Sequence, residues 1–141
     1  MGKEVISAVE SGRSAFHVDI LAHGIVISAD EPIAAGGLGL GLTPTELLCA
    51  ALAACTTMTL RLYCNRKRWV LKSIRTDVTQ APSPDEGGQA HFDRTIHLDG
   101  DLSEDKAARL LAVANRCPVH LILEGGSTIS TRLETEAGGS R

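Results

Sequence analysis

The sequence lacks the features that mark several common classes of protein. Aromatic residues make up 3% of its 141 residues, so it offers little to stack on bases or flat cofactors. Its 14 basic and 17 acidic residues are interspersed and provide no basic face for nucleic acid. No uncharged apolar run reaches roughly 18 residues, and the N-terminus does not resemble a signal peptide. We therefore predict a cytoplasmic protein with no nucleic-acid or membrane partner.

Cysteine is also scarce. The four cysteines, at positions 49, 55, 64 and 117, form neither the dense framework of a small secreted domain nor a CxxC metal motif. A helix turns about 100° per residue, so Cys49 and Cys64 would face away from Cys55 if all three lay on one helix. The sequence therefore predicts no metal site and no bound cofactor.

The length suits one domain with a buried core, and we interpret residues 1–141 as a single domain. Alternating polar and apolar residues predict extended strands. These strands fall within residues 3–29, at 70–79, at 91–98 and at 128–133. A loop rich in glycine is expected at 30–42, and a C-terminal tail at 135–141.

The clearest local signal is Thr43-Pro44-Thr45-Glu46, which supplies a capping hydroxyl, a proline at the first helical position and a glutamate to close a capping box. It predicts a helix over 44–65. From Leu47 to Cys55 this helix is apolar on every face, which is typical of a helix enclosed by protein.

A second helix is predicted over 104–116, capped by Ser103 and ended by Pro118. Cys117 would then lie at a helix C-terminus, where the negative end of the dipole disfavours a thiolate. Capping geometry alone could explain Cys117, and Cys55 could be a small apolar residue of the core. A reactive Cys55 in mid-helix would need a cation from another segment.

Two cysteine motifs resemble those of a known family. Residues 43–60, with the Pro-x-Glu-Leu-Leu opening and Cys55 nine residues after that glutamate, resemble the central helix of the osmotically inducible protein C (OsmC) and organic hydroperoxide resistance (Ohr) family. Arg116-Cys117-Pro118-Val119-His120 resembles the family's second cysteine motif. Residues 30–32, 63–69 and 100–103 fit as well, so the resemblance covers nearly the whole chain.

The resemblance implies an α+β fold in which antiparallel sheets wrap around a long central helix. It also implies an intertwined homodimer with active sites near the subunit interface. Two subunits would cover a helix that is apolar on all sides, which a single chain of this length would struggle to do.

For function, the resemblance implies a thiol peroxidase that reduces organic hydroperoxides. Cys55 would be the attacking thiolate and become a sulfenic acid, and Cys117 would resolve it as a disulfide. A dithiol, lipoyl-linked or small, would then reduce the disulfide. The alternative is an OsmC-like redox-sensing or small-molecule-binding protein with weak or no peroxidase activity.

The groups that would activate Cys55 are Glu46, Arg13 and Arg94. Hydroperoxide-reducing relatives hold an arginine near the thiolate with a glutamate that directly follows the helix proline, where this chain has Thr45. Glu46 comes one residue later and is equally well explained as part of the capping box. This departure from the family pattern supports the alternative without peroxidase activity.

Arg94 is the more unusual of the two arginines. It shares a strand face with Phe92, Ile96 and Leu98, so it should point inward, where it needs an anion. It could instead pair with a core carboxylate or extend to solvent at the sheet edge. We interpret His120 and the other histidines as surface or structural residues.

Overall fold

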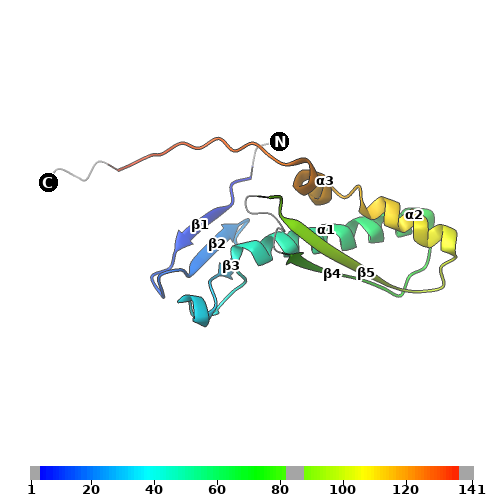
Figure 1. Ribbon diagram of the computed structural model, residues 1–141, viewed down its shortest axis with the longest axis horizontal. Coiled ribbons are helices and arrows are strands. Elements are labelled where there is room, and N and C mark those ends of the chain that lie inside the picture. Colours follow the sequence, from blue (N-terminus) through cyan, green and yellow to red (C-terminus); the bar gives the residue numbers. More distant parts are fainter. Residues whose placement is uncertain (1–3, 82–87, 137–141) are drawn as a thin grey trace.

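Three α-helices and two antiparallel sheets make up the described chain, a computed structural model that describes residues 4–81 and 88–136. Figure 1 shows the long helix α1 with a β-hairpin along one side and two shorter helices following it. A separate three-stranded sheet lies near the N-terminal half of α1. This arrangement confirms the predicted α+β class.

The N-terminal sheet has the order β1-β2-β3. Its strands are β1 (Ser7–Glu10), β2 (Val18–Ala22) and β3 (Ile25–Ala29). A two-residue turn joins the last two strands, and both its residues have positive φ, 52° at His23 and 74° at Gly24. Such a turn matches the right-handed twist of the flanking strands and fixes their register.

Among residues 4–81 and 88–136, nothing covers either face of this sheet completely. Successive side chains of a strand point to opposite faces. In β3, however, Ile25, Val26 and Ile27 are 61%, 58% and 46% exposed. The sheet therefore presents apolar side chains to solvent on both faces.

The loop before α1 is organised by Asp30. Its carboxylate accepts hydrogen bonds from the backbone N–H groups of Glu31, Leu38 and Leu40 at 2.8, 3.1 and 3.2 Å. Burial raises the pKa of Asp30. The three hydrogen bonds, together with nearby His17, lower it by more, so the pKa lies below its usual value. One 3-10 turn, η1 (Ile33–Ala35), interrupts an otherwise irregular path, as the predicted loop requires.

Helix α1 (Pro44–Lys67) begins with the predicted capping box. Thr43 accepts from the Glu46 backbone N–H at 3.2 Å, and the Glu46 carboxylate accepts from the Thr43 N–H at 2.9 Å. The helix ends two residues later than predicted, at Lys67, and the C-cap residue Arg68, with a φ of 59°, leaves the helical region.

Only one face of α1 is buried within the chain. That face carries Leu52, Thr56, Leu60 and Cys64, spaced four residues apart, whereas Met58 on another face is 70% exposed. The other elements of a single chain therefore cover α1 from one side only, and the prediction that protein encloses the helix on every side stays a prediction about a second subunit.

Helix α1 is also long and apolar enough to cross a membrane by length and composition, the one such helix among the described residues. Core helices of soluble proteins meet the same criterion, so this is weak support for a membrane location.

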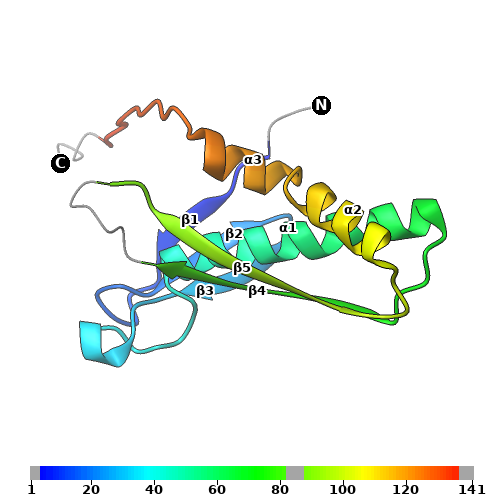
Figure 2. The same ribbon diagram turned by 45° about the vertical axis from the view of Figure 1, so that its right-hand side comes forward.

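The hairpin lies along α1 in both views (Figures 1 and 2) and consists of β4 (Ser73–Ala81) and β5 (His91–Asp99). Its register runs from Ser73 opposite Asp99 to Ala81 opposite His91. A hydrogen bond between the hydroxyls of Thr57 and Thr76, at 2.9 Å, ties α1 to β4. Both predicted strands are confirmed, although the first starts three residues and ends two residues later than predicted.

Two helices follow the hairpin, α2 (Glu104–Ala114) and α3 (Pro118–Gly125). The prediction of one helix that Pro118 ends is wrong in that Pro118 begins a further helix. Proline is tolerated at the first helical position, where its missing N–H would have no partner, and the Cys117 side chain caps the new helix.

The predicted strand at 128–133 is also wrong, because residues 126–136 form no regular element. An isolated alternating segment has no second strand to pair with its backbone groups. The predicted tail at 135–141 lies mostly outside the described residues.

The buried core lies toward the C-terminal end of α1. It consists of Leu60, Cys64, Leu71, Leu110 and Ala114, with Trp69 and Tyr63 packed against it. Burial raises the pKa of Cys64, while nearby Arg61 lowers it by less. Cys64 is therefore a structural thiol.

Candidate active site

Cys117 is fully buried at the junction of α2 and α3. Its Sγ accepts a hydrogen bond from the His120 backbone N–H at 3.4 Å and caps α3. The interpretation of Cys117 as a helix C-terminal residue is therefore incomplete. Cys117 is also the N-cap residue of α3, the end at which a helix dipole is positive.

Thr56 connects Cys117 to α1. Its Oγ1 lies 3.8 Å from Cys117 Sγ and donates its proton to the Leu52 carbonyl at 2.7 Å. The same oxygen accepts from Arg94 Nη1 at 3.0 Å. A hydroxyl has one proton, and here Leu52 already takes it. In this arrangement, therefore, Cys117 donates its S–H to Thr56.

Cys55 precedes Thr56 on α1, so it occupies the adjacent helix face, about 100° away. It is half-buried, with its Sγ 4.0 Å from the Thr59 hydroxyl. Both Cys55 and Cys117 are free thiols in the structure. Cys55 is thus the more accessible of the two.

Cys49 lies apart from these two thiols. It lines a separate pocket of about 480 Å³ against β4, next to Ala53 and Val78. With Cys64 in the core, the two remaining cysteines face away from Cys55, as the helical spacing predicted. Among the described residues, no group of three or more cysteine, histidine or acidic side chains could hold a metal.

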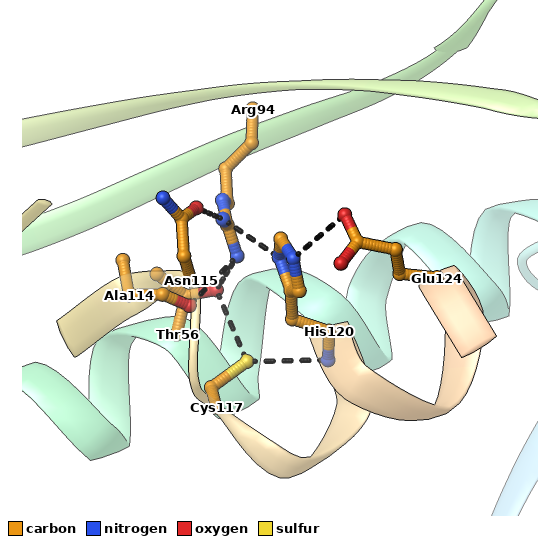
Figure 3. A network of polar contacts seen from close by, with 7 residues as sticks. All are labelled: Thr56, Arg94, Ala114, Asn115, Cys117, His120 and Glu124. Carbon is orange, nitrogen blue, oxygen red and sulfur yellow. Dashed lines mark hydrogen bonds and ion pairs between the residues drawn. The ribbon is translucent and has the colours of Figure 1, made fainter. Parts of the chain in front are cut away.

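Arg94 points inward from β5, as the strand pattern predicted. Figure 3 shows its guanidinium surrounded by acceptors from three other elements. Nη1 donates to Thr56 and to the Ala114 carbonyl at 3.0 and 3.3 Å, and Nη2 donates to Asn115 Oδ1 and His120 Nδ1 at 2.9 and 3.0 Å. None of these acceptors is a carboxylate. Within residues 4–81 and 88–136 Arg94 has no ion-pair partner, so the proposed core carboxylate is absent.

His120 links this network to a carboxylate. Its Nε2 lies 3.3 Å from Glu124 Oε2, one helical turn further along α3 (Figure 3). The interpretation of His120 as a structural or surface residue missed this contact. Had Pro118 been identified as the start of a helix, the spacing of His120 and Glu124 would have placed both on one face.

Arg13 and Glu46, the other predicted activating groups, lie outside this network. Arg13 is exposed between β1 and β2. Glu46 closes the capping box of α1, nine residues before Cys55, which corresponds to about 14 Å along the helix axis. Glu46 therefore cannot touch the Cys55 of its own chain.

A pocket of about 590 Å³ opens beside the network. Arg94, His120 and Glu124 contribute polar groups to its lining. Its apolar lining comes from α1, β5 and α3 and includes Leu48, Leu52, Phe92 and Leu123. Such a lining suits a small molecule with an aliphatic body and one polar group.

The fold and the paired thiols define the class of protein: an α+β protein with one cysteine on a long helix and a second at a junction of helices. Residues 36–132 match the sequence model of the OsmC-like protein family. The chain belongs to this family. No curated protein matches it.

Solved structures show the same fold. An OsmC-like protein from Mycoplasma pneumoniae shares 25% identity, with a TM-score of 0.69 over 88% of this chain and 89% of that one. The organic hydroperoxide resistance protein OsmC from Legionella pneumophila shares 23% identity, with a TM-score of 0.64 over 89% and 91%. The organic hydroperoxide resistance protein OhrB of Bacillus subtilis shares 23%, with a TM-score of 0.57 over 84% and 88%.

Proposed function

We propose that the protein is a thiol-dependent peroxidase that reduces organic hydroperoxides. The Cys55 thiolate attacks the terminal peroxide oxygen, so the S–O bond forms as the O–O bond breaks. The alkoxide takes up a proton and leaves as the alcohol. Cys117 then condenses with the Cys55 sulfenic acid to form a disulfide and water, and a dithiol, lipoyl-linked or small, returns both cysteines to thiols.

One observation carries the proposal: Cys55 is half-buried directly beside Thr56, whose hydroxyl contacts the buried Cys117. An accessible sulfur can meet a peroxide, and a buried one is protected from oxidation until it is needed. The pocket beside Arg94 includes Leu48, Leu52 and Leu123, and such apolar groups suit an organic hydroperoxide better than hydrogen peroxide, although neither Cys55 nor Cys117 lines it. Hydroperoxide resistance proteins among the structural neighbours support the same role.

A second candidate function is redox sensing or small-molecule binding with little peroxidase activity. Thr45 in place of the family glutamate favours it, because Glu46 is engaged in the capping box. Arg94 also favours it, since its guanidinium contacts Thr56 and not Cys55. The roles of Arg94, Arg13 and Glu46 in activating Cys55 therefore remain proposals.

The active form is proposed to be a homodimer in the cytoplasm. The chain exposes 10832 Å², whereas a folded monomer of 14.9 kDa exposes about 7,000 Å². Exposed apolar side chains lie on the N-terminal sheet and on α1, and a second copy would cover them.

The proposal is tested by adding an alkyl hydroperoxide to the reduced protein and following the Cys55–Cys117 disulfide by mass spectrometry. Rapid oxidation is expected, with a sulfenic acid trapped on Cys55 in Cys117→Ser. Cys49→Ser is the matched control, because its thiol lies in a different pocket. Oxidation of Cys55 no faster than that of free cysteine would contradict the peroxidase and favour the second candidate.

A further inference from the structure

We propose that His120 is a positioning residue for Arg94: in its neutral form, with the proton on Nε2, it holds the guanidinium against Thr56 beside Cys117. Closure of the disulfide then slows when His120 is protonated or removed. The inference rests on the proposed function for its chemistry, but the contacts that carry it belong to this chain.

The first step concerns what holds Arg94. Its two terminal nitrogens use four N–H groups, and the acceptors of all four are neutral or need to be neutral to accept. No carboxylate among residues 4–81 and 88–136 pairs with Arg94, so within that part of the chain its position depends on the direction of these bonds. Asn115 is exposed, whereas the His120 side chain is 18% exposed. His120 is therefore the better-ordered acceptor for Nη2.

The second step concerns the proton on His120. An arginine can only donate, so the Nδ1 that faces Arg94 at 3.0 Å must present its lone pair. The ring proton then lies on Nε2, directed at Glu124 at 3.3 Å. A second proton would place an N–H against the guanidinium, and the contact with Arg94 would break.

Other groups around His120 complete its surroundings. Cys117 lies at the start of the same helix, and its sulfur contacts the His120 backbone. From β5, His91 lines the same pocket as Arg94. From α1, the lining consists of Leu48 and Leu52, which carry no charge. The two ring nitrogens of His120 thus contact Arg94 on one side and Glu124 on the other.

The third step connects the position of Arg94 to the closure of the disulfide. To close the disulfide, the Cys117 thiolate attacks the sulfur of the Cys55 sulfenic acid, the S–S bond forms and the S–O bond breaks. The departing hydroxide combines with the proton released by Cys117 and leaves as water. The positive charge of Arg94, held behind Thr56, favours that thiolate. If Arg94 is released, closure slows.

The experiment compares His120→Ala and His120→Asn with the full-length protein. The asparagine Oδ1 can accept from Arg94 near the place of Nδ1, but asparagine does not titrate. His97→Ala is the matched control, because His97 pairs with Asp77 on the outer face of the same hairpin. Closure is started either with an alkyl hydroperoxide or with diamide, a thiol oxidant that needs no peroxide chemistry, from about pH 5.5 to 8.5, where histidine changes charge.

His120→Ala is expected to slow closure about tenfold, the usual effect of losing a hydrogen bond to a charged group. In the wild type, the rate of closure should fall at low pH both because the attacking thiol is protonated and because His120 is protonated. His120→Asn should keep the wild-type rate at high pH and lose the part of the fall that comes from His120. Nitrogen-15 NMR of the reduced protein should show His120 protonated on Nε2.

Closure at the normal rate in His120→Ala, an unchanged acid-side fall in His120→Asn, or a ring proton on Nδ1 would each overturn the inference. The two oxidants separate it from the proposed function. If hydroperoxide fails to oxidise Cys55 in every variant but closure by diamide still depends on His120, the peroxidase is wrong and the positioning role stands.

Discussion

Two faces of α1 have the same apolar character but different surroundings. One face, with Leu52, Thr56, Leu60 and Cys64, is buried under the hairpin, α2 and α3. Another face, with Met58 and Leu62, is 70% and 51% exposed at those residues. The sequence of α1 does not distinguish the two faces. The hairpin, α2 and α3 pack on one of them, which becomes part of the core, and the other is left exposed.

Cys55 lies at the edge between these two faces, where its thiol is close to the buried residues and is also accessible to a peroxide. Cys55→Ser should abolish hydroperoxide reduction, because serine is not nucleophilic enough to replace the thiolate. Peroxide consumption with a dithiol reductant measures the loss. Cys49→Ser should retain activity, and an active Cys55→Ser would place the chemistry elsewhere.

The buried face should dominate stability within one chain. Leu60 is 0% exposed, so Leu60→Ala should lower the free energy of unfolding by about 2–5 kcal/mol through lost transfer energy and a cavity. Chemical denaturation measures it. A cost below about 1 kcal/mol would mean that the core can collapse around the gap.

The exposed face should matter through a second copy. Leu62→Glu should convert a dimer to a monomer, because a buried unpaired carboxylate opposes association. Sedimentation measures the change, and the midpoint of unfolding should become independent of protein concentration. Val70→Glu is the control, since Val70 lies outside α1 and is 87% exposed. A wild-type protein that is already monomeric would contradict the proposed dimer.

A smaller effect is expected at the N-terminal end of the helix. Thr43→Ala should cost about 1 kcal/mol of unfolding free energy, because the N–H of Glu46 loses its acceptor. Glu46→Gln keeps a side-chain oxygen for the cap and removes the charge. If Glu46 acts only in the cap, this variant should retain full peroxidase activity, and a clear loss of kcat would assign it a part in catalysis.

The loop that precedes α1 provides a contrast in pH. The pKa of Asp30 in the folded protein lies below its ordinary value of 3.8. Asp30 therefore contributes stability above that value, and the contribution is lost as pH falls through the lower, folded pKa. Asp30→Asn should be less stable than wild type at neutral pH, and the difference should shrink in acid. A constant difference across the acid range would contradict this.

Local chemistry was enough to predict much of the fold. The capping box and proline at Thr43–Glu46 fixed the start of α1, and alternation revealed β4 and β5. Pro118 was misinterpreted because proline ends one helix and starts another equally well. The pattern at 128–133 predicted a strand, but a strand also needs a partner, which no local pattern can provide.

The candidate site was predicted in part. The inward direction of Arg94 followed from strand periodicity. Its partners, Asn115 and His120, come from segments more than 20 residues away in the sequence, so no local pattern could indicate them. Thr56 was overlooked for a different reason: a threonine on a buried helix face usually bonds its own backbone, and this one does that and more.

The hydroxyl of Thr56 has a single proton, which it donates in a hydrogen bond to the Leu52 carbonyl. If Cys117 loses its own proton, that of Thr56 can rotate to the sulfur, because a thiolate is the stronger acceptor. The carbonyl of Leu52 then keeps only its bond within the helix. The Thr56 hydroxyl can thus switch its hydrogen bond from the Leu52 carbonyl to the Cys117 thiolate, and it returns to the carbonyl when the thiol re-forms.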